Sequence, residues 1–177
     1  VVGGGPAGLF AAVELASADL KVLLLEKGRD IDGRHCPALE RGVTCPPCSP
    51  CHMVSGLGGA GAFSDGKLTL STQVGGRLVD YLGVEKVEEL IHYVDSLYLR
   101  FGAEDHIYGT GEGVDRLSRL ASKAELRLIP LPLRHLGTEQ CRQMLKNMRD
   151  FLLPKIDLRL GTGVNQILTE AGQVVGV

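Results

Sequence analysis

The chain has 177 residues, of which 44% are hydrophobic and 23% charged, the composition of a globular domain with a packed core. Its 19 basic and 21 acidic side chains leave a net charge of −2, which argues against a nucleic-acid partner. We expect no membrane span and a cytoplasmic protein, because no apolar run approaches roughly 20 residues and no basic-then-apolar signal segment is present.

Glycine is the most unusual feature of the composition, with 24 residues in the chain. The glycines gather between periodic segments, at residues 3–8, 56–66, 109–113 and 161–163. Such clusters predict backbone that approaches a ligand closely. The chain opens on Val1 without a methionine and closes in an apolar run ending at Val177, so we expect a piece of a longer protein.

The first 26 residues predict a βαβ unit. Val1 and Val2 are the end of a buried strand, residues 3–8 a tight turn, and residues 6–17 a helix. Residues 21–26 are almost wholly apolar, which is typical of a parallel strand covered on both faces. The predicted fold class is α/β: an incomplete, Rossmann-like domain with a parallel sheet, helices on both faces and part of an inserted substrate region.

The remaining elements follow from periodicity and turn residues. Residues 28–76 form a long irregular stretch, which at this length indicates a functional loop. Helices are predicted at residues 84–101, 113–123 and 138–152, the last capped by Thr138, and extended chain at 126–133. Short strands are predicted at residues 157–160, 164–168 and 173–177, with a hairpin turn at Ala171–Gly172. We divide the chain into a βαβ unit with its glycine- and cysteine-rich loop at 1–80, a helical inserted region at 81–135, and a return helix with strands at 136–177.

The turn at residues 3–8 matches G-x-G-x-x-G and opens a helix directly after a strand. Gly3 permits the tight turn, Gly5 lets the backbone approach a pyrophosphate, and Gly8 allows the helix to pack closely on the strand. Pro6 and Ala7 complete the first turn of that helix, whose unpaired N–H groups favour an anion.

Glu26 ends the second strand, near the spacing expected for an acid that binds ribose hydroxyls. A carboxylate at this position would repel a 2′-phosphate, which argues against NADP. The turn itself serves FAD and NAD alike.

The run VVGGGPAGLFAA at residues 1–12, followed by EKGR at residues 26–29, resembles the opening of glutathione-reductase-type FAD proteins, which have two dinucleotide-binding domains. The resemblance implies that residues 3–8 hold the FAD pyrophosphate, that Glu26 binds the adenosine ribose, and that Lys27 and Arg29 lie at the cofactor. The sequence departs from that pattern at Asp19, where glycine is usual; aspartate tolerates left-handed backbone better than most residues.

A second segment, SGLGGAGAFSDGKL at residues 55–68, resembles predicted FAD-dependent dehydrogenases of unassigned substrate, and RHLGT at residues 134–138 continues the likeness. The resemblance implies that Gly58 and Gly59 run beside the flavin phosphates and ring, and that the backbone of Val164 reaches the adenine. The chemistry of Ser64, Asp65 and Lys67 is compatible with this. Ser64 and Asp65 can hold the ribityl chain or a water that bridges to the phosphates. Lys67 can place positive charge near the flavin N1–C2 edge. The alternative is a glycine-rich surface loop with a solvated lysine.

These features predict an FAD-dependent oxidoreductase that passes hydride through the flavin N5, with a small-molecule substrate or electron acceptor as partner. Two other functions stay open: a dinucleotide-binding module that senses redox state or is structural, and an NAD-dependent dehydrogenase. No catalytic residue is assigned. His135 is a candidate acid or base, and the alternative, which is more common for such a histidine, is an ordinary loop residue.

Cys36, Cys45, Cys48 and Cys51 form C-x8-C-x2-C-x2-C, and His52 follows. Three interpretations remain: an iron–sulfur or zinc site, a redox-active thiol pair near the flavin, and reduced cysteines in a structural loop. The metal site at Cys45, Cys48 and Cys51 is not the favoured one, because prolines interrupt the cluster and no second C-x2-C pair is present. Cys141 is predicted to be a buried apolar side chain.

Overall fold

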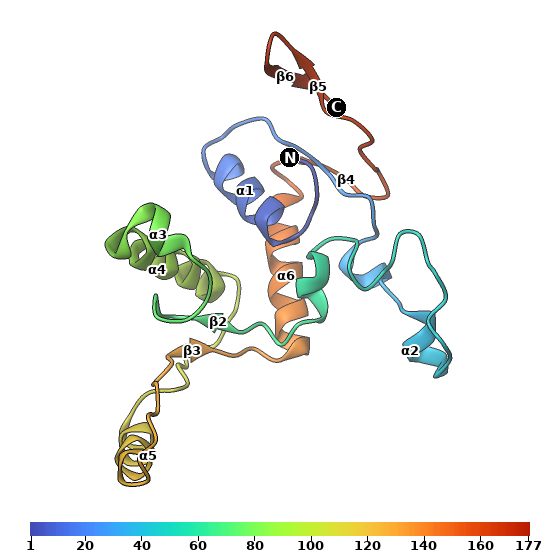
Figure 1. The fold of residues 1–177 in the computed structure, drawn as a ribbon. Helices are drawn as coiled ribbons and strands as arrows, with labels where there is room; N and C mark the ends of the chain where they lie inside the picture. The colour runs from blue at the N-terminus through green and yellow to red at the C-terminus, as the bar shows by residue number, and fades with distance from the viewer. The chain divides into compact units, whose positions relative to one another are not determined.

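The computed structural model describes all residues from Val1 to Val177. Its helices and strands are interspersed along the chain, with α3, α4 and α5 in succession in the middle and β4, β5 and β6 in succession at the end (Figure 1). The helices are α1 (Pro6–Ser17), α2 (Pro37–Arg41), α3 (Leu78–Leu82), α4 (Val84–Arg100), α5 (Glu112–Lys123) and α6 (Thr138–Leu152). The strands are β1 (Leu23–Leu25), β2 (Leu68–Thr69), β3 (Leu133–Arg134), β4 (Asp157–Arg159), β5 (Leu168–Glu170) and β6 (Gln173–Gly176), and short 3₁₀ helices span Ile31–Gly33 and Gly59–Phe63. None of the helices is long and apolar enough to cross a membrane.

Packing divides the chain into two units. The first, here called the turn unit, comprises Val1–Phe63 and Leu145–Val177; the second, here called the middle unit, comprises Ser64–Met144. The boundary falls within α6, so this helix contributes residues to both. The division concerns packing, and the three-segment organisation inferred from the sequence stays a prediction.

A small parallel sheet forms the centre of the turn unit. β1 pairs in parallel with β4, and Val2 forms a parallel bridge to Leu25 on the other side of β1. Leu24 of β1 is fully buried, and α1 buries the apolar face made by Leu9, Ala12, Val13 and Ala16. The result is mixed helix and strand around a small parallel sheet, which agrees with the predicted strand–turn–helix–strand order.

The helix predicted at residues 6–17 is confirmed, and local chemistry explains both of its ends. Pro6 occupies the first helical position, where a missing N–H costs nothing because that amide has no helical acceptor. The helix stops before Ala18, and Asp19 has a φ of 55°. Asp19 therefore takes the left-handed conformation expected where the resembling family has glycine.

The other predicted elements match with small shifts, apart from the segments predicted at 126–133 and 164–168. The stretch predicted to be irregular at residues 28–76 also contains α2 and β2. α4, α5 and α6 lie within about one residue of their predicted bounds. The first helical hydrogen bond of α6 runs from the Cys141 amide to the Gly137 carbonyl. The N-cap of α6 is therefore Gly137 and not the predicted Thr138. The strand predicted at 164–168 is wrong. Ala171 and Gly172, with φ of 48° and 78°, make the tight hairpin turn. Only the residues directly before this turn, in β5, pair with β6.

The extended segment predicted at 126–133 is a strand only at its end, where β3 pairs antiparallel with β2. Pro130 and Pro132 have no amide hydrogen to donate to a sheet, so regular pairing cannot extend back through them. β3 is held instead by Arg134, which is 3% exposed. Its guanidinium forms an ion pair with Asp95 of α4 and hydrogen bonds to the Glu104 carbonyl at 2.9 Å, which ties α4, the following loop and β3 together in the middle unit.

Two cations on α6 anchor the loop that follows β1 in the turn unit. The Arg149 guanidinium contacts Asp30 at 2.9 Å and Asp32 at 3.2 Å, and Lys146 forms an ion pair with Asp32. Hydrogen bonds from Lys146 and then Arg149 lower the pKa of Asp32 below its ordinary value of 3.8. The charged form of Asp32 is thereby stabilised in the folded chain.

We expect Asp32→Asn to remove a stabilisation that exists only where Asp32 is charged. Because the folded pKa is depressed, this contribution is fully present above the ordinary value of 3.8 and is lost as pH falls through the lowered folded value. Asp32 is more than half exposed, so the effect near pH 6 should stay below about 1 kcal/mol. Urea unfolding of both proteins at pH 6 and pH 3 tests this, and an equal difference at the two pH values would contradict it.

Candidate dinucleotide-binding site

The glycine turn between Val2 and α1 is closely packed at two of its glycines. The Gly3 amide donates to the Leu25 carbonyl at 2.7 Å, and Gly3 has a φ of 91°, a left-handed conformation that favours glycine. A Cβ built on Gly8 would lie 1.9 Å from the Gly3 carbonyl oxygen, and one on Gly4 would lie 2.9 Å from the Leu57 side chain. The backbone itself excludes a side chain at Gly8, whereas at Gly4 the end of the Leu57 side chain would have to move.

Gly5 differs from its neighbours because the space beside it is open. No heavy atom lies within 4 Å of a Cβ built on Gly5, which is the N-cap residue of α1. No side chain caps α1, and its first turn contains no acidic residue. Since Pro6 has no amide hydrogen and the Ala7 and Gly8 amides precede the first helical bond, the positive end of the helix remains available to an anion.

Glu26 lies directly after β1 and is 5% exposed. One carboxylate oxygen accepts from the Gly4 amide at 2.6 Å, and the other accepts from the Gly28 amide at 2.7 Å and the Gly56 amide at 2.9 Å. A carboxylate has about four acceptor positions, so three protein donors leave room for about one more hydrogen bond. Glu26 thus joins three glycine segments and retains capacity for a hydroxyl donor.

The second glycine segment lies against the first. The Gly58 amide donates to the Gly4 carbonyl at 2.7 Å, and a Cβ on Gly59 would lie 3.1 Å from the Gly5 Cα and 3.3 Å from Pro6. A Cβ on Gly58 would meet the Leu145 side chain at 2.7 Å. Small residues at Gly58 and Gly59 therefore allow the chain to run beside the turn.

The chain after β4 borders the same region. The Gly161 amide donates to the Gly28 carbonyl and the Thr162 amide to the Glu26 carbonyl, each at 2.9 Å. Val164 follows and is half-buried, while the side chains of Lys27 and Arg29 are exposed. The structure thus brings together the predicted site residues Gly3, Gly5, Pro6, Ala7, Gly8, Glu26, Gly58 and Gly59, with Lys27, Arg29 and Val164 on adjoining segments of the turn unit.

The predicted site residues Ser64, Asp65 and Lys67 belong to the middle unit. Lys67 forms an ion pair with Asp65 at 2.8 Å, and the His135 ring lies 3.5 Å from the same carboxylate. Ser64 accepts a hydrogen bond from the Gly66 amide at 3.0 Å. Hydrogen bonding by Lys67 lowers the pKa of Asp65, so this carboxylate stays charged and the Lys67 charge is already partnered.

Arg34 is a residue of this region that the sequence did not single out. It is 2% exposed, and its guanidinium donates to the carbonyls of His52, Met53 and Leu57, each at 2.8 Å. It also lies 4.8 Å from the ring centre of Phe63. Arg34 thereby fixes the approach to the second glycine segment. No motif or spacing signals this role, because the acceptors are backbone carbonyls about 20 residues away.

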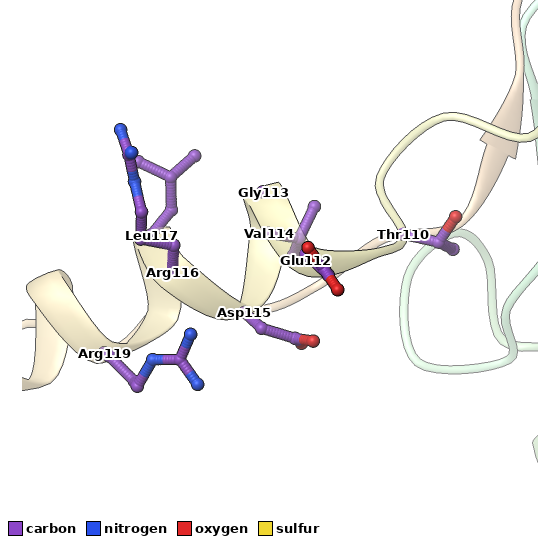
Figure 2. Close-up of a pocket in the computed structure, with 8 residues that line it drawn as sticks. All are labelled: Thr110, Glu112, Gly113, Val114, Asp115, Arg116, Leu117 and Arg119. Carbon is purple, nitrogen blue, oxygen red and sulfur yellow. The ribbon is translucent and has the colours of Figure 1, made fainter.

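A hollow at the start of α5 does not involve the glycine turn. It has a volume of about 760 Å³, lies in the middle unit and is lined by Thr110 and the first turns of α5. Figure 2 shows that the side chains of Glu112, Asp115 and Arg119 spread outward along the helix and do not converge on a common point. Since none of the residues of α5 is buried, this hollow is an open surface and offers no group of side chains for chemistry.

Comparison with known proteins supports this assignment of the amino terminus. Residues 1–41 match the sequence profile of a family described as NAD(P)-binding Rossmann-like domain. A Clostridium beijerinckii protein described only as uncharacterized is 35% identical over 107 residues, which is 60% of this chain and 19% of that protein. The chain therefore spans about a fifth of the length of this relative. The amino-terminal match indicates a dinucleotide-binding domain of the type found in oxidoreductases.

Proposed function

We propose that this chain supplies the FAD-binding part of an FAD-dependent oxidoreductase. The observation that carries the proposal is the open space at Gly5, at the uncapped amino terminus of α1, between Glu26 and the second glycine segment. A pyrophosphate fits such a place because the backbone there presents N–H groups and a partial positive charge and no side chain obstructs it.

In this proposal the residues of the turn unit divide the binding of the cofactor among them. Residues 3–8 hold the pyrophosphate, and the remaining acceptor position of Glu26 takes a ribose hydroxyl. The backbone at Val164 meets the adenine, and the Gly58–Gly59 backbone lies along the phosphates. When bound, FAD supplies hydride acceptance and donation at N5, while the chain's own residues bind and orient it.

The choice of FAD over NAD rests on the second glycine segment. The family profile covers residues 1–41, a turn that serves both cofactors. The segment at residues 55–63 lies outside that match, resembles flavin-dependent dehydrogenases in sequence, and packs directly on the turn through Gly58 and Gly59. The redox partner is a small-molecule substrate or electron acceptor, and localisation in the cytoplasm belongs to the same proposal.

Titration of the purified chain with FAD and, separately, with NAD⁺ tests the cofactor. We expect saturable quenching of flavin fluorescence, with one FAD per chain, and we expect excess NAD⁺ to displace little of it. Reduction of bound flavin by dithionite, with loss of its visible absorption bands, then reports a redox-competent site. Saturable binding of NAD⁺ without binding of FAD would contradict the proposal and favour a nicotinamide-dependent dehydrogenase.

A further inference from the structure

The four cysteines of the loop between β1 and the second glycine segment share a single cavity, which their spacing alone did not establish. The cavity has a volume of about 20 Å³ and belongs wholly to the turn unit. Its lining residues are Cys36, Cys45, Cys48, Cys51, His35, His52, Pro37, Pro46 and Met53. Cys36, which stands apart from the other three in sequence, is thus part of the same group.

The surroundings of two of these cysteines are fixed by hydrogen bonds. The Cys36 carbonyl accepts from the Glu40 amide at 3.0 Å as α2 begins, and the Cys51 carbonyl accepts from the Ser55 amide at 2.8 Å. Buried Arg34 holds the carbonyls of His52 and Met53. The backbone carrying Cys36 and Cys51 is therefore positioned by contacts that do not involve the thiols.

The chemistry of the lining points to a thiophilic metal ion. All four cysteines are free thiols, and thiolate sulfur is a ligand that selects soft or borderline ions such as Zn²⁺. The cavity has a volume of about 20 Å³, close to the roughly 10–15 Å³ that one water needs, so it has room for one atom-sized guest in the present arrangement. Four sulfurs complete the tetrahedral shell of a structural zinc site.

We propose that Cys36, Cys45, Cys48 and Cys51 together bind one Zn²⁺ ion. Binding requires the thiols of Cys45 and Cys48, both exposed, to turn inward, because in the structure no three His, Cys, Asp or Glu side chains are arranged as metal ligands. Each ligating thiol gives up its proton to solvent as its sulfur bonds to the ion, so binding strengthens as pH rises. The ion would close the loop immediately before the second glycine segment.

Cobalt(II) is the probe, because it replaces zinc in tetrahedral thiolate sites and is coloured. The chain is purified under reducing conditions with a chelator, freed of the chelator, and titrated anaerobically with Co²⁺. We expect saturation at one ion per chain, intense thiolate-to-cobalt charge-transfer absorption, tetrahedral visible bands, and loss of these bands when Zn²⁺ is added. With Zn²⁺ bound, the thiols of Cys36, Cys45, Cys48 and Cys51 should resist a thiol reagent that modifies them in the metal-free chain.

The variants Cys36→Ser, Cys45→Ser, Cys48→Ser and Cys51→Ser are each expected to lose the tetrahedral spectrum. Cys141→Ala is the matched control and should retain it, because Cys141 is buried in α6 within the middle unit and burial raises the pKa of its thiol. Far-UV circular dichroism verifies that each variant is folded. An unchanged cobalt spectrum in any of the four variants, a disulfide among these cysteines in the reduced preparation, or iron with acid-labile sulfide would each overturn the four-thiolate zinc site.

Discussion

Gly5→Val is expected to weaken FAD binding by about tenfold to a hundredfold while the chain stays folded. The wild-type backbone leaves the space at Gly5 free, so the new side chain meets no protein atom within 4 Å of its Cβ and fills the position proposed for the pyrophosphate. Forcing a bulky group into an occupied space typically costs about 1–3 kcal/mol, and roughly 1.4 kcal/mol is a factor of ten in affinity. Flavin fluorescence titration measures the affinity, and urea unfolding measures the stability.

Two glycine variants serve as controls for this result. Gly8→Ala should have the opposite phenotype, a loss of stability of about 3 kcal/mol, because its Cβ would stand 1.9 Å from the Gly3 carbonyl oxygen. Gly76→Val should change neither quantity, since Gly76 also has open space but belongs to the middle unit. Wild-type FAD affinity in Gly5→Val would mean that the cofactor does not bind at the amino terminus of α1.

Glu26→Gln is expected to destabilise the chain by about 2–4 kcal/mol even without a ligand. The amide oxygen of glutamine can replace one carboxylate oxygen, but its NH₂ group then faces a backbone N–H that has lost its acceptor. Hydrogen bonds to a charged group contribute about 1.5–3 kcal/mol, and an unsatisfied buried donor costs about 1–3 kcal/mol. Chemical denaturation of the two proteins at neutral pH measures this difference.

Glu88→Gln is the matched control for Glu26→Gln. Glu88 lies exposed on α4, and a surface substitution of this kind changes stability by about 0.5 kcal/mol or less. If Glu26→Gln were as stable as Glu88→Gln, the three amide contacts to the Glu26 carboxylate would not contribute to folding, and Glu26 would serve the ligand alone.

The βαβ unit was predictable because its signals are local. The spacing of Gly3, Gly5 and Gly8, the proline at the start of α1 and the apolar run ending at Glu26 each act within a few residues. The same is true of the hairpin turn at Ala171–Gly172, which needs two residues with positive φ. Residues 164–168 lacked such a local signal, and apolar content alone predicted a strand that starts too early, since β5 begins only at Leu168.

Much of the candidate site could not be predicted, because it depends on long-range contacts that no local sequence pattern encodes. Arg34 and the second glycine segment meet through backbone carbonyls, and any residue can supply a carbonyl. The spacing of Cys45, Cys48 and Cys51 was visible in the sequence, but the presence of Cys36 on the same cavity depends on how the loop folds around Arg34. The spacing of Glu26 predicts that it binds a ribose, whereas its hydrogen bonds to three backbone amides depend on the fold and have no sequence signal.

The shared carboxylate of Glu26 has a further consequence for how the site meets its ligand. Its hydrogen bonds join residues 22 and 30 positions apart in the chain, so the entropy of bringing these segments together is lost when the chain folds. A dinucleotide then enters a preorganised cradle and loses little affinity to the ordering of loops. The glycine turn, the end of β1 and the second glycine segment are accordingly joined through one side chain, and the same carboxylate that stabilises the fold holds the three segments in place for a ligand.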